Sequence, residues 1–263
     1  MDATGTAVVT GASRGIGRAV ALELARLGFD VVAGMRDPDA AAGFLAAPDE
    51  ARGSLRVARL DVTDPATIVL PRELRVLVNN AGIERDYLPV EHAPLEDWRA
   101  VFETNVFGLV ETTRRAIPAL RRAGGGVICN VTSSSILVPV PFYGVYRASK
   151  AAVASLGETL VAELAPFGIR VLEILPGPVD TDMLAGSDRL PEGARHAGYE
   201  DMAQGMLEGR RAVHGLITST ADAARAICSA ILDDEAGLRR ACDPLGRGLL
   251  DAWRADPLQF VPR

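Results

Sequence analysis

Short apolar runs alternate with longer segments of helical periodicity along most of the chain. The runs are rich in Val and Leu without polar alternation, which is typical of parallel strands buried on both faces. We expect strands within residues 7–9, 31–33, 55–60, 76–78, 127–131 and 171–175. Apolar positions that recur on neighbouring turns predict helices at about residues 18–27, 95–122, 146–167, 220–232 and 245–254. The alternation predicts an α/β fold, with a doubly wound parallel sheet and helices on both faces.

Nothing in the pattern indicates a second domain. No repeat, low-complexity tract or linker divides the 263 residues, so we expect one domain over residues 1–263. Residues 180–215 differ from their surroundings, because they contain several glycines and Pro191 and show weak periodicity. We expect this segment to be a mobile insertion that covers the site of function.

Composition narrows the classes of function. The net charge of −6 and the pI near 5.2 argue against a surface that neutralises nucleic-acid phosphates, so we expect no nucleic-acid partner. Cys129, Cys228 and Cys242 are widely spaced, which favours neither a disulfide framework nor a metal site. The longest apolar stretch, residues 136–145, is broken by prolines, and the first residues lack the positive charge of a signal peptide. We therefore expect a cytoplasmic protein with no membrane span.

A glycine-rich turn follows the first predicted strand. Residues 10–17 read T-G-A-S-R-G-I-G, and a helix is predicted to start at their end. Glycines allow a tight turn, and a helix N-terminus presents free N–H groups to a pyrophosphate. A purely structural turn is the alternative, but the position between strand and helix favours phosphate binding.

The spacing T-G-x-x-x-G-x-G resembles that of the short-chain dehydrogenase/reductase family, and the resemblance extends over nearly the whole chain. Residues 79–82 are similar to the family's N-N-A-G motif, and residues 176–181 are similar to its nicotinamide-side loop. The family's catalytic set is matched by Asn105, Ser133, Tyr146 and Lys150. The resemblance implies a Rossmann-type fold, a homodimer or homotetramer formed through the helices at 95–122 and 146–167, and no metal. It also implies cofactor contacts from Gly11, Ser13, Arg14, Gly15, Ile16, Gly17, Arg36, Asp61, Val62, Asn80, Ala81, Gly82, Tyr146, Lys150, Pro176, Gly177, Val179 and Thr181.

The end of the second predicted strand favours NADP(H) as the cofactor. An NAD enzyme places an acidic residue there to bind the ribose 2′-hydroxyl, and by comparison with the family Met35 occupies that position. Arg36 supplies positive charge for a 2′-phosphate, and Arg14 can reach the same group. Asp37 leaves an alternative open, because its carboxylate could weaken the phosphate site or serve an NAD ribose. Asp61 and Val62 are similar to the family's adenine-contacting pair, although Asp61 also suits a simple helix cap.

Tyr146 and Lys150 have the spacing of an acid/base pair. Hydride transfer to a carbonyl builds negative charge on oxygen, which requires an acid beside it. The pKa of a free phenol is about 10, and we expect an ammonium four residues later on the same helical face to lower it. Lys150 is the only lysine in the chain. An ammonium can contact ribose hydroxyls and share in a proton relay, whereas guanidinium does not readily lose a proton.

Family spacing also selects the remaining polar residues of the set. Ser133 occupies the position of the family's substrate-orienting serine, with Ser134 and Ser135 as chemical alternatives. Tyr143 lacks a lysine four residues later, so we interpret it as a pocket wall. Asn105 falls inside a predicted helix, where the family's asparagine distorts the helix and helps to hold a water beside the lysine.

The substrate side is predicted to be apolar. Residues 136–142 contain no charge and face the substrate in the family, and the sequence around Tyr146 resembles the 17β-hydroxysteroid and retinol dehydrogenase branch. We therefore expect NADPH-dependent reduction of a carbonyl, or oxidation of the alcohol, in a bulky apolar substrate such as a steroid-like, aromatic or polyketide ketone. An NADPH-binding regulator without turnover, a 3-oxoacyl reductase, and an epimerase or dehydratase are the alternatives.

Two positions depart from the family pattern. Only seventeen residues separate Asp61 from Asn79, which is too few for the usual third helix. Ile136 also replaces a glycine that commonly follows the serine, so we expect a reshaped pocket mouth.

Overall fold

The computed structural model describes residues 1–39, 51–186 and 189–260. Within them, seven strands form one sheet in the order β3-β2-β1-β4-β5-β6-β7, and every neighbouring pair is parallel. The strands are β1 (Thr6–Thr10), β2 (Asp30–Met35), β3 (Leu55–Arg59), β4 (Val76–Asn79), β5 (Gly126–Val131), β6 (Ile169–Leu175) and β7 (Arg239–Ala241). The order reverses between β1 and β4, and such reversals leave a crevice at the carboxyl ends of the strands.

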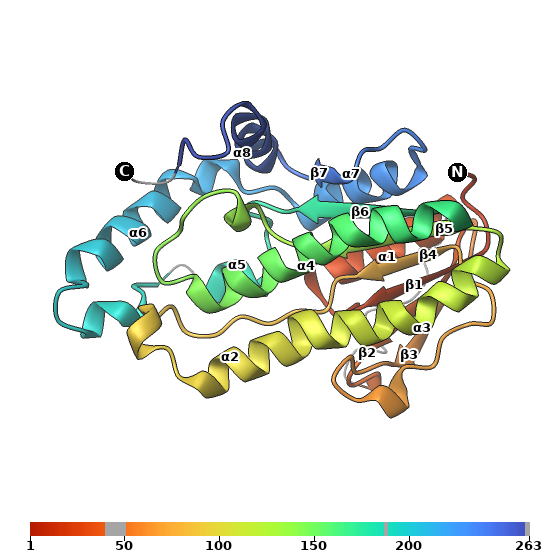
Figure 1. The fold of residues 1–263 in the computed structure, drawn as a ribbon, viewed down its shortest axis with the longest axis horizontal. Coiled ribbons are helices and arrows are strands. Elements are labelled where there is room, and N and C mark those ends of the chain that lie inside the picture. The colour runs from red at the N-terminus through yellow and green to blue at the C-terminus, as the bar shows by residue number, and fades with distance from the viewer. Residues whose placement is uncertain (40–50, 187–188, 261–263) are drawn as a thin grey trace.

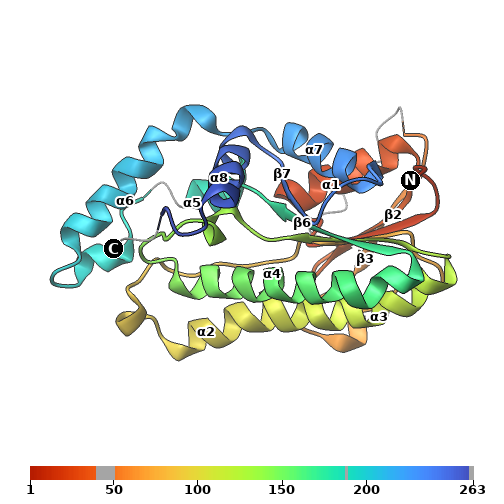
Figure 2. The same cartoon turned by 45° about the horizontal axis from the view of Figure 1, so that its top comes forward.

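Helices cover both faces of the sheet (Figures 1 and 2). On one side lie α1 (Gly15–Leu27) and α7 (Thr220–Leu232), packed against each other. On the other lie α2 (Leu95–Phe102), α3 (Gly108–Arg122) and α4 (Gly144–Leu164). Alternate residues of each strand join separate apolar clusters on the two faces; Val9 packs toward α1, for example, and Val8 toward α3. The predicted doubly wound Rossmann-type fold is confirmed.

Two elements differ from the predicted pattern. The helix expected over residues 95–122 is interrupted by a π-helical turn, Glu103–Phe107, between α2 and α3; the turn contains Asn105, where the family resemblance implied a distortion. The edge strand β7 was not predicted, because it has only three partly exposed residues, two of them arginines. Arg239 is held there by Glu173 of β6, which is 1% exposed, and by Glu158 of α4, at 2.8 and 2.7 Å.

The segment 180–215 contains more regular structure than its weak periodicity indicates. It includes α5 (Asp182–Gly186) and α6 (Glu200–Ala212), and Figure 1 shows α6 at the end of the molecule away from the N-terminus. Ala203 and Met206 of α6 pack against Tyr87 and Phe142, whereas most of the helix is exposed. Two glycines and only a few buried positions explain why the helix was missed. The mobility of the segment and the single-domain boundary stay predictions.

The remaining elements agree with the sequence pattern. Between β3 and β4 the helical structure is limited to a short 3₁₀ turn, Pro65–Thr67, as the short spacing from Asp61 to Asn79 predicts. Helix α8 (Pro244–Ala255) is capped by Asp243 and packs Leu250 against Leu175 and Leu137. In the part of the chain that the structure describes, no helix has the length and apolarity needed to cross a membrane.

Candidate active site

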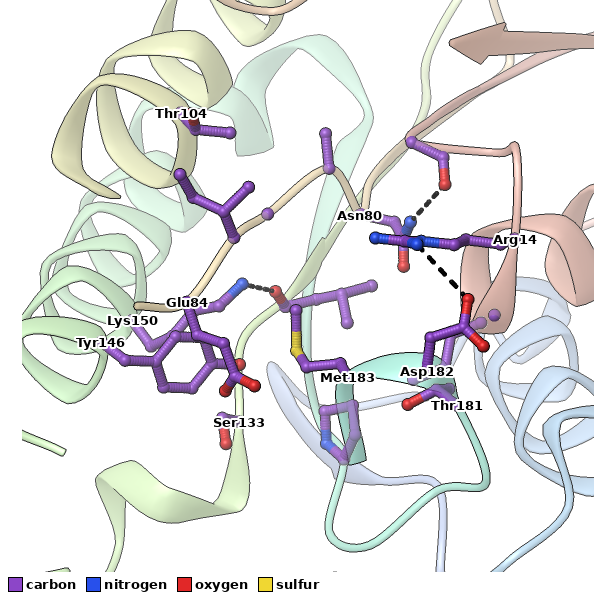
Figure 3. A pocket seen from close by; sticks show the side chains of 18 of the residues that line it. Arg14, Asn80, Glu84, Thr104, Ser133, Tyr146, Lys150, Thr181, Asp182 and Met183 are labelled. Atoms are coloured by element: carbon purple, nitrogen blue, oxygen red, sulfur yellow. Dashed lines mark hydrogen bonds and ion pairs between the residues drawn. The ribbon is translucent and has the colours of Figure 1, made fainter. Parts of the chain in front are cut away.

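A pocket of about 540 Å³ opens at the carboxyl ends of β1, β4, β5 and β6. All the predicted cofactor contacts line it except Gly17, and Ser133 lines it as well. Figure 3 shows Arg14, Asn80 and Thr181 in one part of the site and Ser133, Tyr146 and Lys150 in another. The sequence therefore predicted most of the pocket wall around the crevice.

The glycine-rich turn has the backbone shape of a phosphate cradle. Gly11 and Gly15 have φ values of 64° and 56°, in the left-handed region that favours glycine. A Cβ at Gly11 would lie 2.8 Å from Ala81 Cα, and one at Gly15 would lie 3.3 Å from Thr181 Cγ2. No acidic residue stands in the first turn of α1, so its free N–H groups face the pocket without a nearby carboxylate on the same helix. These residues fit the pyrophosphate of a dinucleotide.

Gly17 was predicted to contact the cofactor, but in the structure it has a packing role instead. It does not line the pocket, and a side chain there would overlap the Asn80 amide and the Gly11 carbonyl oxygen. Asn80 Nδ2 donates to the carbonyl oxygens of Thr10 and Gly11 at 3.0 and 3.1 Å. Gly17 therefore allows the loop after β4 to lock onto the glycine-rich turn.

The end of β2 places Arg36 in the pocket wall, and Asp37 lines an adjoining cavity together with Arg14 and Arg36. Met35 is 2% exposed, and the Asp37 carboxylate accepts from the backbone N–H of Asp39 at 3.1 Å. Arg14 also lines the pocket, and its guanidinium forms an exposed ion pair with Asp182 at 3.4 Å. Exposed pairs of this kind contribute about 0–1 kcal/mol, so Asp182 does not hold Arg14 firmly.

Asp61 and Val62 both line the pocket next to these residues. The Asp61 carboxylate accepts from the backbone N–H and the hydroxyl of Thr63 at 3.0 and 2.8 Å, whereas Asp64 caps the 3₁₀ turn. The simple helix-cap alternative for Asp61 is therefore wrong.

Tyr146 and Lys150 lie on α4, on the same side of the pocket; Lys150 is buried and Tyr146 is half-buried. Lys150 Nζ lies 5.7 Å from the centre of the Tyr146 ring and donates to the Val131 carbonyl oxygen at 2.8 Å. Burial lowers the pKa of Lys150 to about 8. Burial also raises the pKa of Tyr146 above its ordinary value, and the charge of Glu84 and the Tyr143 hydroxyl act in the same direction. The expectation that Lys150 lowers the Tyr146 pKa is wrong for this structure, because burial dominates the shift and the group that lowers this pKa is Ser133, through a hydrogen bond.

Ser133 stands where the resemblance placed it. Its hydroxyl is close enough to Tyr146 to lower the tyrosine pKa by hydrogen bonding, and it accepts from the Ser135 N–H at 3.2 Å. Neither Ser134 nor Ser135 lines the pocket, so Ser133 is the serine of the three that can reach a substrate there. Tyr143 is a pocket wall, as predicted.

Asn105 lies in the π-helical turn and is 1% exposed. Its amide accepts from the Ile83 N–H at 2.8 Å and donates to the Ile83 carbonyl oxygen at 2.9 Å and to Ser149 Oγ at 3.0 Å. The side chain does not line the pocket. It fixes the loop after β4 against α4, close to Lys150.

The apolar run at residues 136–142 does not line the pocket, which corrects the predicted substrate wall. Leu137 packs toward α8, and Phe142 packs toward α6 from a left-handed backbone with φ of 65°. The wall consists instead of side chains that the sequence did not single out, among them Ile83, Glu84, Tyr87, Met183 and Leu184. A signal for Glu84 was its position two residues after the N-N-A-G motif at the end of β4.

Comparisons with known proteins agree with this geometry. Residues 5–190 match the family model for short chain dehydrogenase. An uncharacterized oxidoreductase of Bacillus subtilis (strain 168), YusZ, is 40% identical over 69% of this chain and 67% of its own length. Retinol dehydrogenase 8 of Bos taurus is 37% identical over 69% of this chain and 61% of its own. Estradiol 17-beta-dehydrogenase 2 of Rattus norvegicus is 32% identical over 69% and 50%.

Solved structures show the same likeness over nearly the whole chain. A short chain dehydrogenase from Burkholderia cenocepacia J2315 in complex with NADP is 27% identical, with a TM-score of 0.77 over 100% of both chains. A short chain dehydrogenase/reductase from Burkholderia phymatum in complex with NAD is 27% identical, with a TM-score of 0.78 over 100% of this chain and 98% of that one. The chain therefore belongs to the short-chain dehydrogenase/reductase family and is an oxidoreductase of that family, acting on alcohol or carbonyl groups.

Proposed function

We propose that this protein is an NADPH-dependent reductase of bulky, largely apolar ketones, such as steroid-like, aromatic or polyketide ketones, and that it also oxidises the corresponding alcohols. The observation that carries the proposal is the convergence of Ser133, Tyr146 and Lys150 on one side of a pocket whose other part is a phosphate cradle. Part of the pocket wall is apolar, because Ile83, Met183 and Leu184 line it. Residues 136–142 do not line the pocket.

Each polar residue has a role in this reaction. The nicotinamide nucleotide supplies the hydride when bound. Ser133 donates a hydrogen bond to the substrate oxygen, and Tyr146 gives that oxygen its phenolic proton as negative charge develops. Because the pKa of Tyr146 is raised, the phenol stays protonated at neutral pH, which suits an acid in the direction of reduction. Lys150 contacts the ribose hydroxyls and relays the replacement proton, and Asn105 is a positioning residue for the loop beside it.

The proposed cofactor is NADP(H), on the strength of Arg36 and Arg14 in the pocket wall. The two solved relatives hold NADP and NAD, so the preference rests on this chain's own arginines. Gly11, Ser13, Gly15 and Ile16 are proposed to hold the pyrophosphate, and Asp61 and Val62 the adenine. The residues proposed at the nicotinamide end are Ala81, Gly82, Pro176, Gly177, Val179 and Thr181.

We also propose a homo-oligomer that forms through α2, α3 and α4. These helices run side by side along one face (Figure 2) and expose large apolar side chains. Those with more than a third of their surface exposed are Leu95, Phe107, Val110 and Val161. Large apolar side chains that stay exposed on neighbouring helices support a protein–protein interface on this face.

The test of the proposed function is Tyr146→Phe in a screen of steroid, aromatic, quinone and aliphatic carbonyls with NADPH. Loss of the general acid should lower kcat at least about a hundredfold, while the Kd for NADPH, measured by fluorescence, stays near the wild-type value. Tyr143→Phe is the matched control, because this neighbouring ring lines the pocket without a serine beside its hydroxyl. A near-normal kcat in Tyr146→Phe would exclude Tyr146 as the acid.

A further inference from the structure

Arg147 follows Tyr146 directly on α4, but it does not line the pocket. Its half-buried guanidinium donates from Nε to the Ser135 carbonyl oxygen at 2.9 Å and from Nη2 to the Ile136 carbonyl oxygen at 3.0 Å. Both carbonyls belong to the 3₁₀ turn Ser134–Ile136, which begins directly after Ser133. One side chain of α4 therefore holds the segment that carries the proposed substrate-orienting serine.

The turn leaves these two carbonyl oxygens for a side chain to satisfy. Its own backbone hydrogen bonds use the carbonyl oxygens of Ser133 and Ser134, which accept from the N–H groups of Ile136 and Leu137 at 3.3 and 3.0 Å. The next two carbonyls stand at the end of a short helical segment, where backbone acceptors have no partner inside the helix. A guanidinium suits them, because it presents its N–H groups in a rigid fork and keeps its charge.

The position of the Ser133 hydroxyl depends on this turn. Ser133 precedes the turn in an extended backbone conformation, and its Oγ accepts from the Ser135 N–H at 3.2 Å. The same hydroxyl forms a hydrogen bond with Tyr146. From the side of β6, the Ser134 N–H donates to the Pro176 carbonyl oxygen at 2.8 Å. The turn is therefore held by a backbone bond on one side and by the α4 guanidinium on the other.

We propose that Arg147 is a positioning residue for the reaction, which fixes the turn after Ser133 so that the serine hydroxyl and the Tyr146 phenol meet the same substrate oxygen. The two side chains come from different elements, the end of β5 and the first turns of α4, so a shift between these elements would separate them. Charge-assisted hydrogen bonds are strong enough to resist such a shift. This inference rests on the proposed function, because it concerns the hydroxyl that orients the substrate there.

The first test is a double-mutant cycle between Arg147 and Ser133, measured as NADPH oxidation with the carbonyl that wild type reduces fastest. Arg147→Met should lower kcat by about tenfold to a hundredfold, as expected for a misplacement near 1 Å, while the Kd for NADPH stays within about twofold of wild type. In a Ser133→Ala background the same substitution should lower kcat no further, because no hydroxyl is left to position. A general loss of structure would instead multiply with the loss from Ser133→Ala.

Two further variants control for charge and folding. Arg147→Lys keeps the cation without the fork, so it should retain part of the lost kcat, and it replaces Arg147→Met in the cycle if that variant does not fold. Arg170→Met is the matched control, because Arg170 is also half-buried, donates to the backbone carbonyls of Ile231 and Asp233, and does not line the pocket. It should lower stability to urea and leave kcat unchanged.

Hydrogen exchange at the Ser135 amide gives a readout that requires no turnover. This N–H donates to Ser133 Oγ, so its exchange rate, followed by NMR on protein with isotope-labelled serine, reports the order of the turn. Exchange should be several-fold faster in Arg147→Met than in wild type, and unchanged in Arg170→Met.

The outcomes separate the two proposals. A normal kcat in Arg147→Met, an unchanged Ser135 exchange rate, or losses that multiply in the double variant would overturn the positioning role. If wild type reduces no carbonyl while Ser135 exchange responds to Arg147 and not to Arg170, the proposed reductase function fails and the hold of Arg147 on the Ser133 turn stands.

Discussion

Arg36 is the residue on which the choice between the two nicotinamide nucleotides depends. Each charged hydrogen bond to a 2′-phosphate contributes about 1.5–3 kcal/mol, and Asp37, which lies outside this pocket wall, should subtract less. We expect wild type to bind NADPH more tightly than NADH. Replacing Met35 by Asp and Arg36 by Ser should invert the preference, because the new carboxylate accepts from the ribose 2′-hydroxyl and repels the phosphate.

The measurement is Kd for both reduced nucleotides at two salt concentrations, since screening weakens phosphate contacts. Asp37→Asn serves as the control and should leave the order of affinities unchanged. Equal affinities in wild type, or an unchanged ratio in the double variant, would assign the specificity to another residue.

Lys150 links stability to pH through its burial. A pKa that falls from 10.5 in the unfolded chain to about 8 in the folded protein costs the folded state about 3 kcal/mol below pH 8. Between pH 8 and 10.5 the unfolded chain binds more protons, so this cost disappears as the pH rises. Lys150→Met should therefore be more stable than wild type at pH 7, with a gain reduced by the lost bond to Val131, and the gain should vanish near pH 10.

Urea unfolding at pH 7, 8, 9 and 10 measures this difference. Lys150→Arg, which stays protonated over the whole range, should show no such recovery with pH. A pH-independent gap between Lys150→Met and wild type would show that Lys150 has an ordinary pKa in the folded protein.

Among the secondary-structure elements, α8 is connected to the pocket wall through hydrogen bonds to the Asp243 carboxylate. Asp243 is 3% exposed and accepts from the Gly246 N–H at 2.7 Å, which caps α8, and from the Gly177 N–H at 2.6 Å in the pocket wall. Asp243→Ala loses a helix cap worth about 1 kcal/mol and a charged hydrogen bond worth about 1.5–3 kcal/mol. We expect the free energy of unfolding to fall by about 2–4 kcal/mol and nucleotide binding to weaken.

Chemical denaturation and NADPH titration check both parts. Asp251→Ala, on the same helix but exposed and paired with Arg254, should change the free energy of unfolding by less than about 1 kcal/mol. If Asp243→Ala lowers stability without affecting nucleotide affinity, α8 does not position the Gly177 loop.

Buried elements were predictable from the sequence, and elements whose form depends on distant contacts were not. Continuous Val and Leu runs identified β1 to β6, and motif spacing identified Ser133, Tyr146 and Lys150. Periodicity alone did not show the π-helical turn, although the family resemblance implied a distorted helix at Asn105; hydrogen bonds between Asn105 and Ile83, twenty-two residues away, hold the turn. The apolar run before Tyr146 was assigned to the wrong surface, since the left-handed backbone of Phe142 directs its ring toward α6.

At the scale of the whole molecule, α4 connects the pocket to the core. It packs on β6 and on the π-helical turn, and it carries both Tyr146 and Lys150. Leu160 and Leu164, at its other end, belong to the apolar cluster that covers one face of the sheet. The geometry of the pocket therefore depends on the same packing that holds the sheet together.

Because Lys150 is the only lysine and lies within α4, a lysine-specific protease has a single cleavage site in the chain, after a side chain that is 5% exposed. Cleavage should require unfolding and should yield two fragments, residues 1–150 and 151–263. Under native conditions the cleavage rate should follow the free energy of unfolding measured with urea, and bound NADPH should slow cleavage as its concentration rises above Kd. Gel electrophoresis over a urea series would measure both effects, and rapid cleavage in the absence of urea would reveal local opening of α4 instead.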